Sequence, residues 1–164
     1  MAVTYEPIAT TTLSTTASTV DFTSISGSYT DLILICSLKG TAATDLALRF
    51  NSDSGSNYSA TQLWGNGSST GSLRTTNQTY AAVDYYGYIE STDFTVNIIH
   101  IMNYSNSTTY KTVLARANQA ANGTNAGVAL WRNTSAITTV RAMLTNAQSF
   151  ASGSTFTLYG VKAA

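Results

Sequence analysis

The chain of 164 residues is poor in ionised and in chemically reactive side chains. It has one Cys, one His and one Pro, two Glu and three Lys, and eight basic residues balance eight acidic ones. A single cysteine cannot form an internal disulfide, and one His with one Cys excludes zinc sites built from nitrogen and sulfur ligands. Sparse, balanced charge argues against nucleic-acid or membrane-surface binding. No apolar run is long enough for a transmembrane helix.

Small uncharged polar residues take the place of the missing charges. Thr occurs 28 times, Ser 20 times and Asn 12 times. Thr, Val, Ile, Tyr and Phe suit pleated strands, whereas Ser, Asn and Gly form turns, and polar helix formers are nearly absent. The composition predicts an all-β protein: a single domain over residues 1–164, folded as an antiparallel two-sheet β-sandwich of jelly-roll type with about eight to ten short strands.

Low charge also bears on the surface. Charged residues make up 10% of the chain, against about a quarter of an ordinary globular domain. Such a surface is poorly protected against association, so we expect partners or copies of the chain to cover much of it. Leu32–Cys36 is apolar at every position, which predicts that both faces of this strand are covered by another layer, a loop or a neighbouring subunit.

Alternation of apolar and polar residues predicts which side chains face the core. In the strand expected over 45–51, Leu46, Leu48 and Phe50 point inward. In the strand expected over 94–102, the inward residues are Phe94, Val96, Ile98 and Met102. Gly65–Gly71 is expected to be a mobile or partner-ordered loop, and Asn118–Gly127 a polar loop.

No residue stands out as catalytic. His100 is in phase with the expected inward residues of its strand, which favours a structural role over a catalytic one. Cys36 lies in the apolar run and is expected to act as a small hydrophobe. Glu90 and Asp93 flank what looks like a solvated turn rather than a catalytic pair. We therefore expect neither an enzyme nor a cofactor.

The loop Asn51–Asn57 has oxygen-bearing side chains at alternate positions and a glycine among them. This pattern loosely resembles a calcium loop but lacks its closing acidic residue. Asp and Asn also favour tight connections between strands, which is the preferred interpretation, with calcium binding as the alternative.

Ten Tyr and two Trp are many for a chain with so few charges. They could form a sugar-stacking platform, a dry contact between subunits, or ordinary core and cross-strand packing. The candidate contact residues are Trp64, Tyr85, Tyr86, Tyr88, Trp131 and Arg132.

Three segments resemble small virion proteins of tailed bacteriophages, especially phages of aquatic hosts: YEPIATTT at 5–12, LRFNSDSGSNY at 48–58 and GSTFTLYGVK at 153–162. The resemblance implies a jelly-roll sandwich, commonly trimeric, that either decorates the capsid as a cement protein or forms the distal domain of a tail fibre. It implies a location in the virion after synthesis in the host cytoplasm. It assigns no functional residue.

The first hypothesis is a capsid decoration protein that binds the major capsid protein or other virion proteins as a homotrimer. The first expected strand starts within five residues of Met1, which leaves no room for a fibre shaft and favours decoration over a fibre tip. The second hypothesis is an adhesin that binds a host surface glycan through exposed tyrosines. Neither involves nucleic acid or a membrane.

Overall fold

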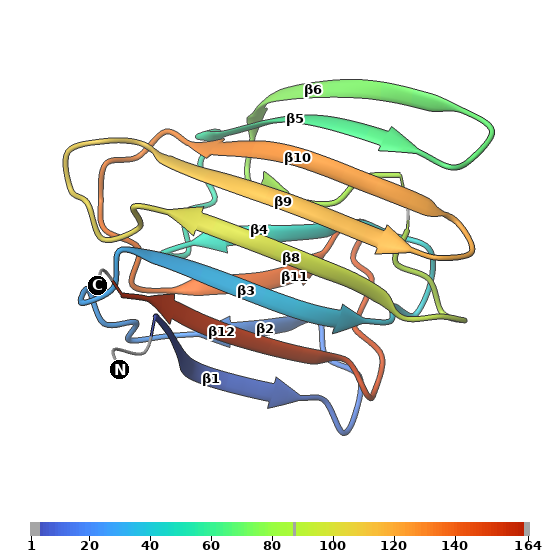
Figure 1. The fold of residues 1–164 in the computed structure, drawn as a ribbon, viewed down its shortest axis with the longest axis horizontal. Coiled ribbons are helices and arrows are strands. Elements are labelled where there is room, and N and C mark those ends of the chain that lie inside the picture. Colours follow the sequence, from blue (N-terminus) through green and yellow to red (C-terminus); the bar gives the residue numbers. More distant parts are fainter. Residues whose placement is uncertain (1–3, 87, 163–164) are drawn as a thin grey trace.

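The computed structural model describes residues 4–86 and 88–162, which form two packed antiparallel β-sheets without a helix (Figure 1). The large sheet has eight strands in the order β1 (Tyr5–Thr12), β12 (Thr155–Val161), β3 (Asp31–Leu38), β8 (Thr95–Met102), β9 (Lys111–Gln119), β10 (Gly123–Trp131), β5 (Tyr58–Gly65) and β6 (Thr70–Gln78). The small sheet has four strands in the order β2 (Thr19–Phe22), β11 (Val140–Leu144), β4 (Leu46–Phe50) and β7 (Ala81–Ala82).

The chain crosses between the two sheets repeatedly, since β1, β3 and β5 lie in the large sheet and β2 and β4 in the small one (Figure 1). This arrangement confirms the predicted two-sheet sandwich. The described residues form twelve strands rather than eight to ten. Among these residues, no helix has the length and apolarity needed to cross a membrane.

The core lies between the sheets and follows the alternation of the strands. Leu46, Leu48 and Phe50 of β4 are fully buried, as predicted, and so is Cys36 of β3. Each large apolar side chain removed from water contributes about 1.5–3 kcal/mol. The inner face of β3 therefore joins the two sheets into one core.

Two segments predicted as loops contain strand: the prediction for Gly65–Gly71 holds only for its central residues, and that for Asn118–Gly127 was wrong for most of the segment. The β5–β6 hairpin reduces the expected Gly65–Gly71 loop to residues 66–69, where Asn66 Oδ1 accepts hydrogen bonds from the backbone N–H groups of Ser68 and Ser69. Within 118–127, β9 continues to Gln119 and β10 begins at Gly123. Small and polar side chains suggested loops, yet the backbone ladder of a sheet does not require apolar side chains.

The predicted orientation of β8 was also wrong by one residue. Its inner face carries Thr95, Asn97, Ile99 and Ile101, all buried, whereas Val96, Ile98, His100 and Met102 point outward. Both faces of this strand carry large apolar residues, and the inner face also carries polar ones, so alternation alone could not decide between them. A shift of one residue exchanges the two faces of a strand.

Candidate functional site

The outer face of the large sheet, turned away from the small sheet, exposes many large apolar side chains. We call these residues the apolar face: Ile33, Ile35, Leu63, Val96, Ile98, Met102, Leu114 and Val128. Leu63 is 62% exposed and Val128 47% exposed. The largest apolar patch on a monomeric soluble protein is typically about 300–600 Å², and such patches are often functional.

Strand register makes this patch continuous. Ile33 of β3 pairs with His100 of β8, His100 with Leu114 of β9, and Leu114 with Val128 of β10. In the next row, Ile35 pairs with Ile98. Directly opposed side chains on one face of a sheet lie in contact range, so the apolar face extends over neighbouring strands, with His100 and Arg116 as the two basic side chains within it.

A shallow groove of ≈ 660 Å³ runs along this face. Its lining includes Ala126 and Gly127 of β10, together with Leu63, Leu114 and Val128. Ala126 pairs with Leu63 on one side and with Arg116 on the other. The groove therefore forms where a small side chain lies between longer ones.

Charge on the outer face is limited and partly neutralised. His100 Nε2 lies 2.9 Å from Asp31 Oδ2, and Asp31 Oδ1 accepts a hydrogen bond from the Asn103 backbone N–H at 2.6 Å. Neutral threonines border the apolar face, for example Thr10 and Thr157, whose hydroxyls are hydrogen-bonded to each other. An apolar centre depleted in charge within a polar rim is the anatomy of a protein–protein interface.

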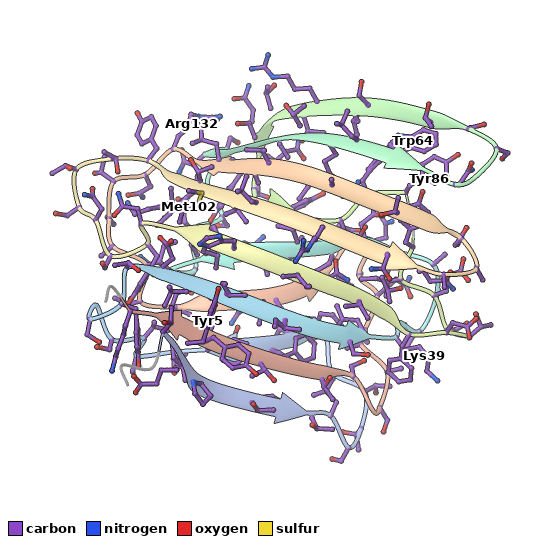
Figure 2. The ribbon with its side chains drawn as sticks, viewed as in Figure 1. Tyr5, Lys39, Trp64, Tyr86, Met102 and Arg132 are labelled. Atoms are coloured by element: carbon purple, nitrogen blue, oxygen red, sulfur yellow. The ribbon has the colours of Figure 1, made fainter. Side chains whose placement is uncertain are left out.

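Four of the predicted contact residues gather at one end of β5. The rings of Trp64 and Tyr86 stack with centroids 4.1 Å apart, and Tyr86 also contacts Tyr85 and Tyr88. Figure 2 shows Trp64 and Tyr86 close together there. Tyr88 is buried and its hydroxyl donates to the Gly65 carbonyl, whereas Tyr86 is 46% exposed. The exposed part of this cluster is the Trp64–Tyr86 stack.

The other two predicted contact residues lie at the opposite end of the sheet, where Figure 2 labels Arg132. Trp131 is buried and stacks on Tyr58 with centroids 6.2 Å apart. Arg132 donates from Nη2 to the Ser56 carbonyl and to Asn77 Oδ1. The candidate residues thus form two separate groups, and the side chain of Trp131 is used within the core.

Asp53 organises the loop in which calcium binding was the alternative. Its carboxylate accepts hydrogen bonds from Trp131 Nε1 at 2.8 Å, Asn57 Nδ2 at 2.9 Å and the Gly55 N–H at 2.8 Å. Partial burial acts to raise the pKa of Asp53, but these hydrogen bonds outweigh it and lower the pKa. The acidic side chain is saturated with donors from its own chain, which supports the tight-connection interpretation.

The remaining reactive residues show no catalytic arrangement. Burial raises the pKa of the Cys36 thiol far above its usual range, so the reactive thiolate is disfavoured. Glu90 accepts a hydrogen bond from Asn122 Nδ2. Within residues 4–86 and 88–162, no group of three or more His, Cys, Asp and Glu side chains is placed to share a metal ion.

No protein-family model matches this chain, and a search of curated proteins finds no similar sequence. Sequence reasoning missed the apolar face. Two signals pointed to it: the uninterrupted apolar run Leu32–Cys36 and the apolar residues on both faces of β8. In the structure Leu34 is fully buried but Ile35 is 40% exposed. The sequence predicted that another layer, a loop or a neighbouring subunit covers the second face of β3. Among the described residues neither a layer nor a loop covers Ile35 fully, so a neighbouring subunit is the alternative that remains.

Proposed function

We propose that this chain is a structural contact protein of a bacteriophage particle, which decorates the assembled capsid and stabilises it. The observation that carries the proposal is the apolar face, an apolar sheet surface with a threonine rim and few charges. The resemblance of three segments to small virion proteins of tailed phages suggests that the assembly which this face contacts is a virion.

The size of the apolar face suits this role. It spans five strands spaced about 4.8 Å apart and about five residues along each strand, or roughly 400 Å². A standard interface buries about 800 Å² per partner. The partner surface therefore extends over the threonine rim, where neutral hydroxyls cost less to desolvate than charged groups.

The partner is a surface of the assembled capsid with its own apolar patch. A protein that binds only the assembled state stabilises that state by mass action. Capsids that lack the chain are expected to release their genome at a lower temperature than complete capsids, and adding the purified chain back restores the release temperature.

A charged substitution in the apolar face tests the contact directly. Leu114→Glu places a carboxylate at the centre of the apolar face, at a position 41% exposed, so the fold tolerates it while the contact does not. We expect co-sedimentation with capsids to weaken at least tenfold, which corresponds to about 1.4 kcal/mol. The matched control is Thr23→Glu, an exposed position directly after β2 of the small sheet. Equal binding of both variants, or binding to tails alone, would refute the capsid proposal.

A second candidate function is favoured by the Trp64–Tyr86 stack. Aromatic rings with one exposed face bind the apolar faces of sugars, and a surface hollow nearby is lined by Asn66, Asn118 and Asn122, whose amides can hydrogen-bond hydroxyl groups. In this alternative the chain is a tail-fibre or adhesin domain for a host surface glycan. Binding on a glycan array that Tyr86→Ala abolishes and Leu114→Glu preserves would favour it.

A further inference from the structure

The interior of the sandwich is not apolar throughout. Toward the end where β8 begins and β9 finishes, the inner face of the large sheet carries uncharged polar side chains that are nearly inaccessible to solvent. These residues are Gln62, Thr95, Asn97, Gln119 and Asn125, each at most 2% exposed.

Strand register brings three of these side chains around one small residue. Asn97 of β8 pairs with Ala117 of β9, and Ala117 pairs with Asn125 of β10. Gln119 lies two residues beyond Ala117, on the same face of β9. The backbones of Asn97 and Asn125 are thus about 9.6 Å apart, which is two strand spacings. Because the Ala117 side chain between them is a methyl group, it leaves room between the two amide side chains.

The segment that contains Asp84 is hydrogen-bonded to this row. Gln62, which accepts a hydrogen bond from Asn125 Nδ2 at 2.9 Å, donates to the Ala82 carbonyl at 3.2 Å. Farther along the sequence, the Tyr88 carbonyl accepts a hydrogen bond from Thr95 Oγ1. Asp84 lies in sequence between these two anchors and is 1% exposed. These two hydrogen bonds, to carbonyls on either side of Asp84 in the sequence, bring this part of the chain against the polar row.

Four oxygen atoms of this group have no hydrogen-bond partner among the described residues: Asp84 Oδ2, Asn97 Oδ1, Gln119 Oε1 and Asn125 Oδ1. Asn97 Nδ2 is the one donor of the group in the same condition. Buried polar atoms without partners are rare in native proteins, and an ion or water that the protein binds is a common explanation. The excess of acceptors over donors favours a cation.

We propose that Asp84, Asn97, Gln119 and Asn125 form a calcium-binding site inside the sandwich. Carboxylate and amide oxygens are ligands that Ca²⁺ prefers, at about 2.4 Å. An ion with oxygen ligands on opposite sides spans about 4.8 Å, so Asn97 and Asn125 each need to lean only about 2.4 Å toward Ala117. A water bound to the ion can accept the hydrogen bond that Asn97 Nδ2 offers.

The electrostatics of Asp84 agree with this site. Burial and, to a smaller extent, the negative charge of Asp45 together raise the pKa of Asp84 to about 8. Two carboxylates close together in a low-dielectric interior favour a bound positive charge. The ion has a route inward, since Gln119 also lines a surface hollow of ≈ 500 Å³ beside Gly65 and Gly123.

Thermal unfolding of the full chain tests the site. After dialysis against EDTA, CaCl₂ is added to 5 mM, and KCl at equal ionic strength serves as the salt control. Because Ca²⁺ binds the folded state, we expect the midpoint to rise with CaCl₂ and not with KCl. Calorimetric titration with CaCl₂ is expected to give one site with a dissociation constant on the order of 10⁻⁴ M, as in modules with few carboxylate ligands.

Two variants and one control locate the ion. Asp84→Asn keeps the shape but removes the charge, and it is expected to abolish the calcium-dependent shift. Gln119→Leu is expected to weaken binding at least tenfold. The control, Asp53→Asn, changes a carboxylate saturated by its own chain and is expected to retain the full shift. The proposal is overturned if calcium does not raise the wild-type midpoint, or if Asp84→Asn responds as the wild type does. None of these results depends on the role in a virion.

Discussion

Two aspartates show how differently the two ends of the sandwich treat a carboxylate. Asp53 accepts hydrogen bonds from Trp131, Asn57 and Gly55, which lower its pKa. Asp84 accepts one from the Tyr85 N–H, its Oδ2 has no partner among the described residues, and burial raises its pKa to about 8. A buried carboxylate stays ionised where donors are buried with it and takes up a proton or a cation where they are not.

The surroundings of the two residues differ in the same sense. Near Asp53, Trp131 packs against Phe50 and Tyr58 with ring centroids 5.6 and 6.2 Å apart. At the other end of the sandwich, the amide side chains of Asn97 and Asn125 flank the small residue Ala117. One end is held by packing and saturated hydrogen bonds, and the other is completed by something that the chain itself does not supply.

The largest effect is expected from removing Trp131. Trp131→Ala leaves a cavity between Phe50 and Tyr58 and removes a donor to Asp53, and such truncations cost about 3–5 kcal/mol. Urea unfolding measures the loss. Tyr86→Ala, which truncates an aromatic residue that is 46% exposed, is the control and is expected to cost less than about 1 kcal/mol. Equal losses of stability in the two variants would show that the core around Trp131 is not more tightly packed than the surroundings of Tyr86.

The next effect is a pH dependence of stability caused by Asp84. Its pKa is raised from an ordinary 3.8 to about 8, so between these values the folded chain holds a proton that the unfolded chain has released. The stabilisation is complete below pH 3.8 and is lost as the pH rises toward 8, by about 1.4 kcal/mol per pH unit.

Asp84→Asn has no such proton to lose. In EDTA, the free energy of unfolding of the wild type relative to that of Asp84→Asn is therefore expected to fall from pH 5 to pH 7. Urea unfolding at each pH measures this difference. Parallel pH profiles for the two proteins would contradict a raised pKa of the buried Asp84 carboxyl group.

The sandwich was predictable from the sequence because composition and clean alternation agreed. Leu46, Leu48 and Phe50 alternate with short or polar neighbours, and their inward orientation follows from that pattern alone. On β8 the inner face carries Asn97 and the outer face carries Ile98, the reverse of the usual rule. The orientation of this strand depends on what the other sheet provides, which a local pattern does not contain.

The candidate sites were less predictable for a related reason. Trp64 and Tyr86 are 22 positions apart in the sequence. Their rings meet because the segment that follows β7 passes beside the end of β5. Asn97 and Asn125, which are 28 positions apart, are brought to one region by strand register. By contrast, the tight connection at Asp53 was predictable, because Gly55 and Asn57 are close in sequence.

The smallest effect is expected at Asp53, where the pH dependence has the opposite sign. The lowered pKa of this residue means that its stabilisation is present above the ordinary pKa of 3.8 and is lost as the pH falls through the folded value. Because the carboxylate is only partly buried, screening by solvent limits its contribution to about 1 kcal/mol. Asp53→Asn is therefore expected to lower stability slightly at pH 7 and to match the wild type near pH 2, as urea unfolding at both pH values can measure. If Asp53→Asn instead became relatively more stable as the pH rose, the two aspartates would behave alike, and the contrast between a saturated and an unsaturated carboxylate would be lost.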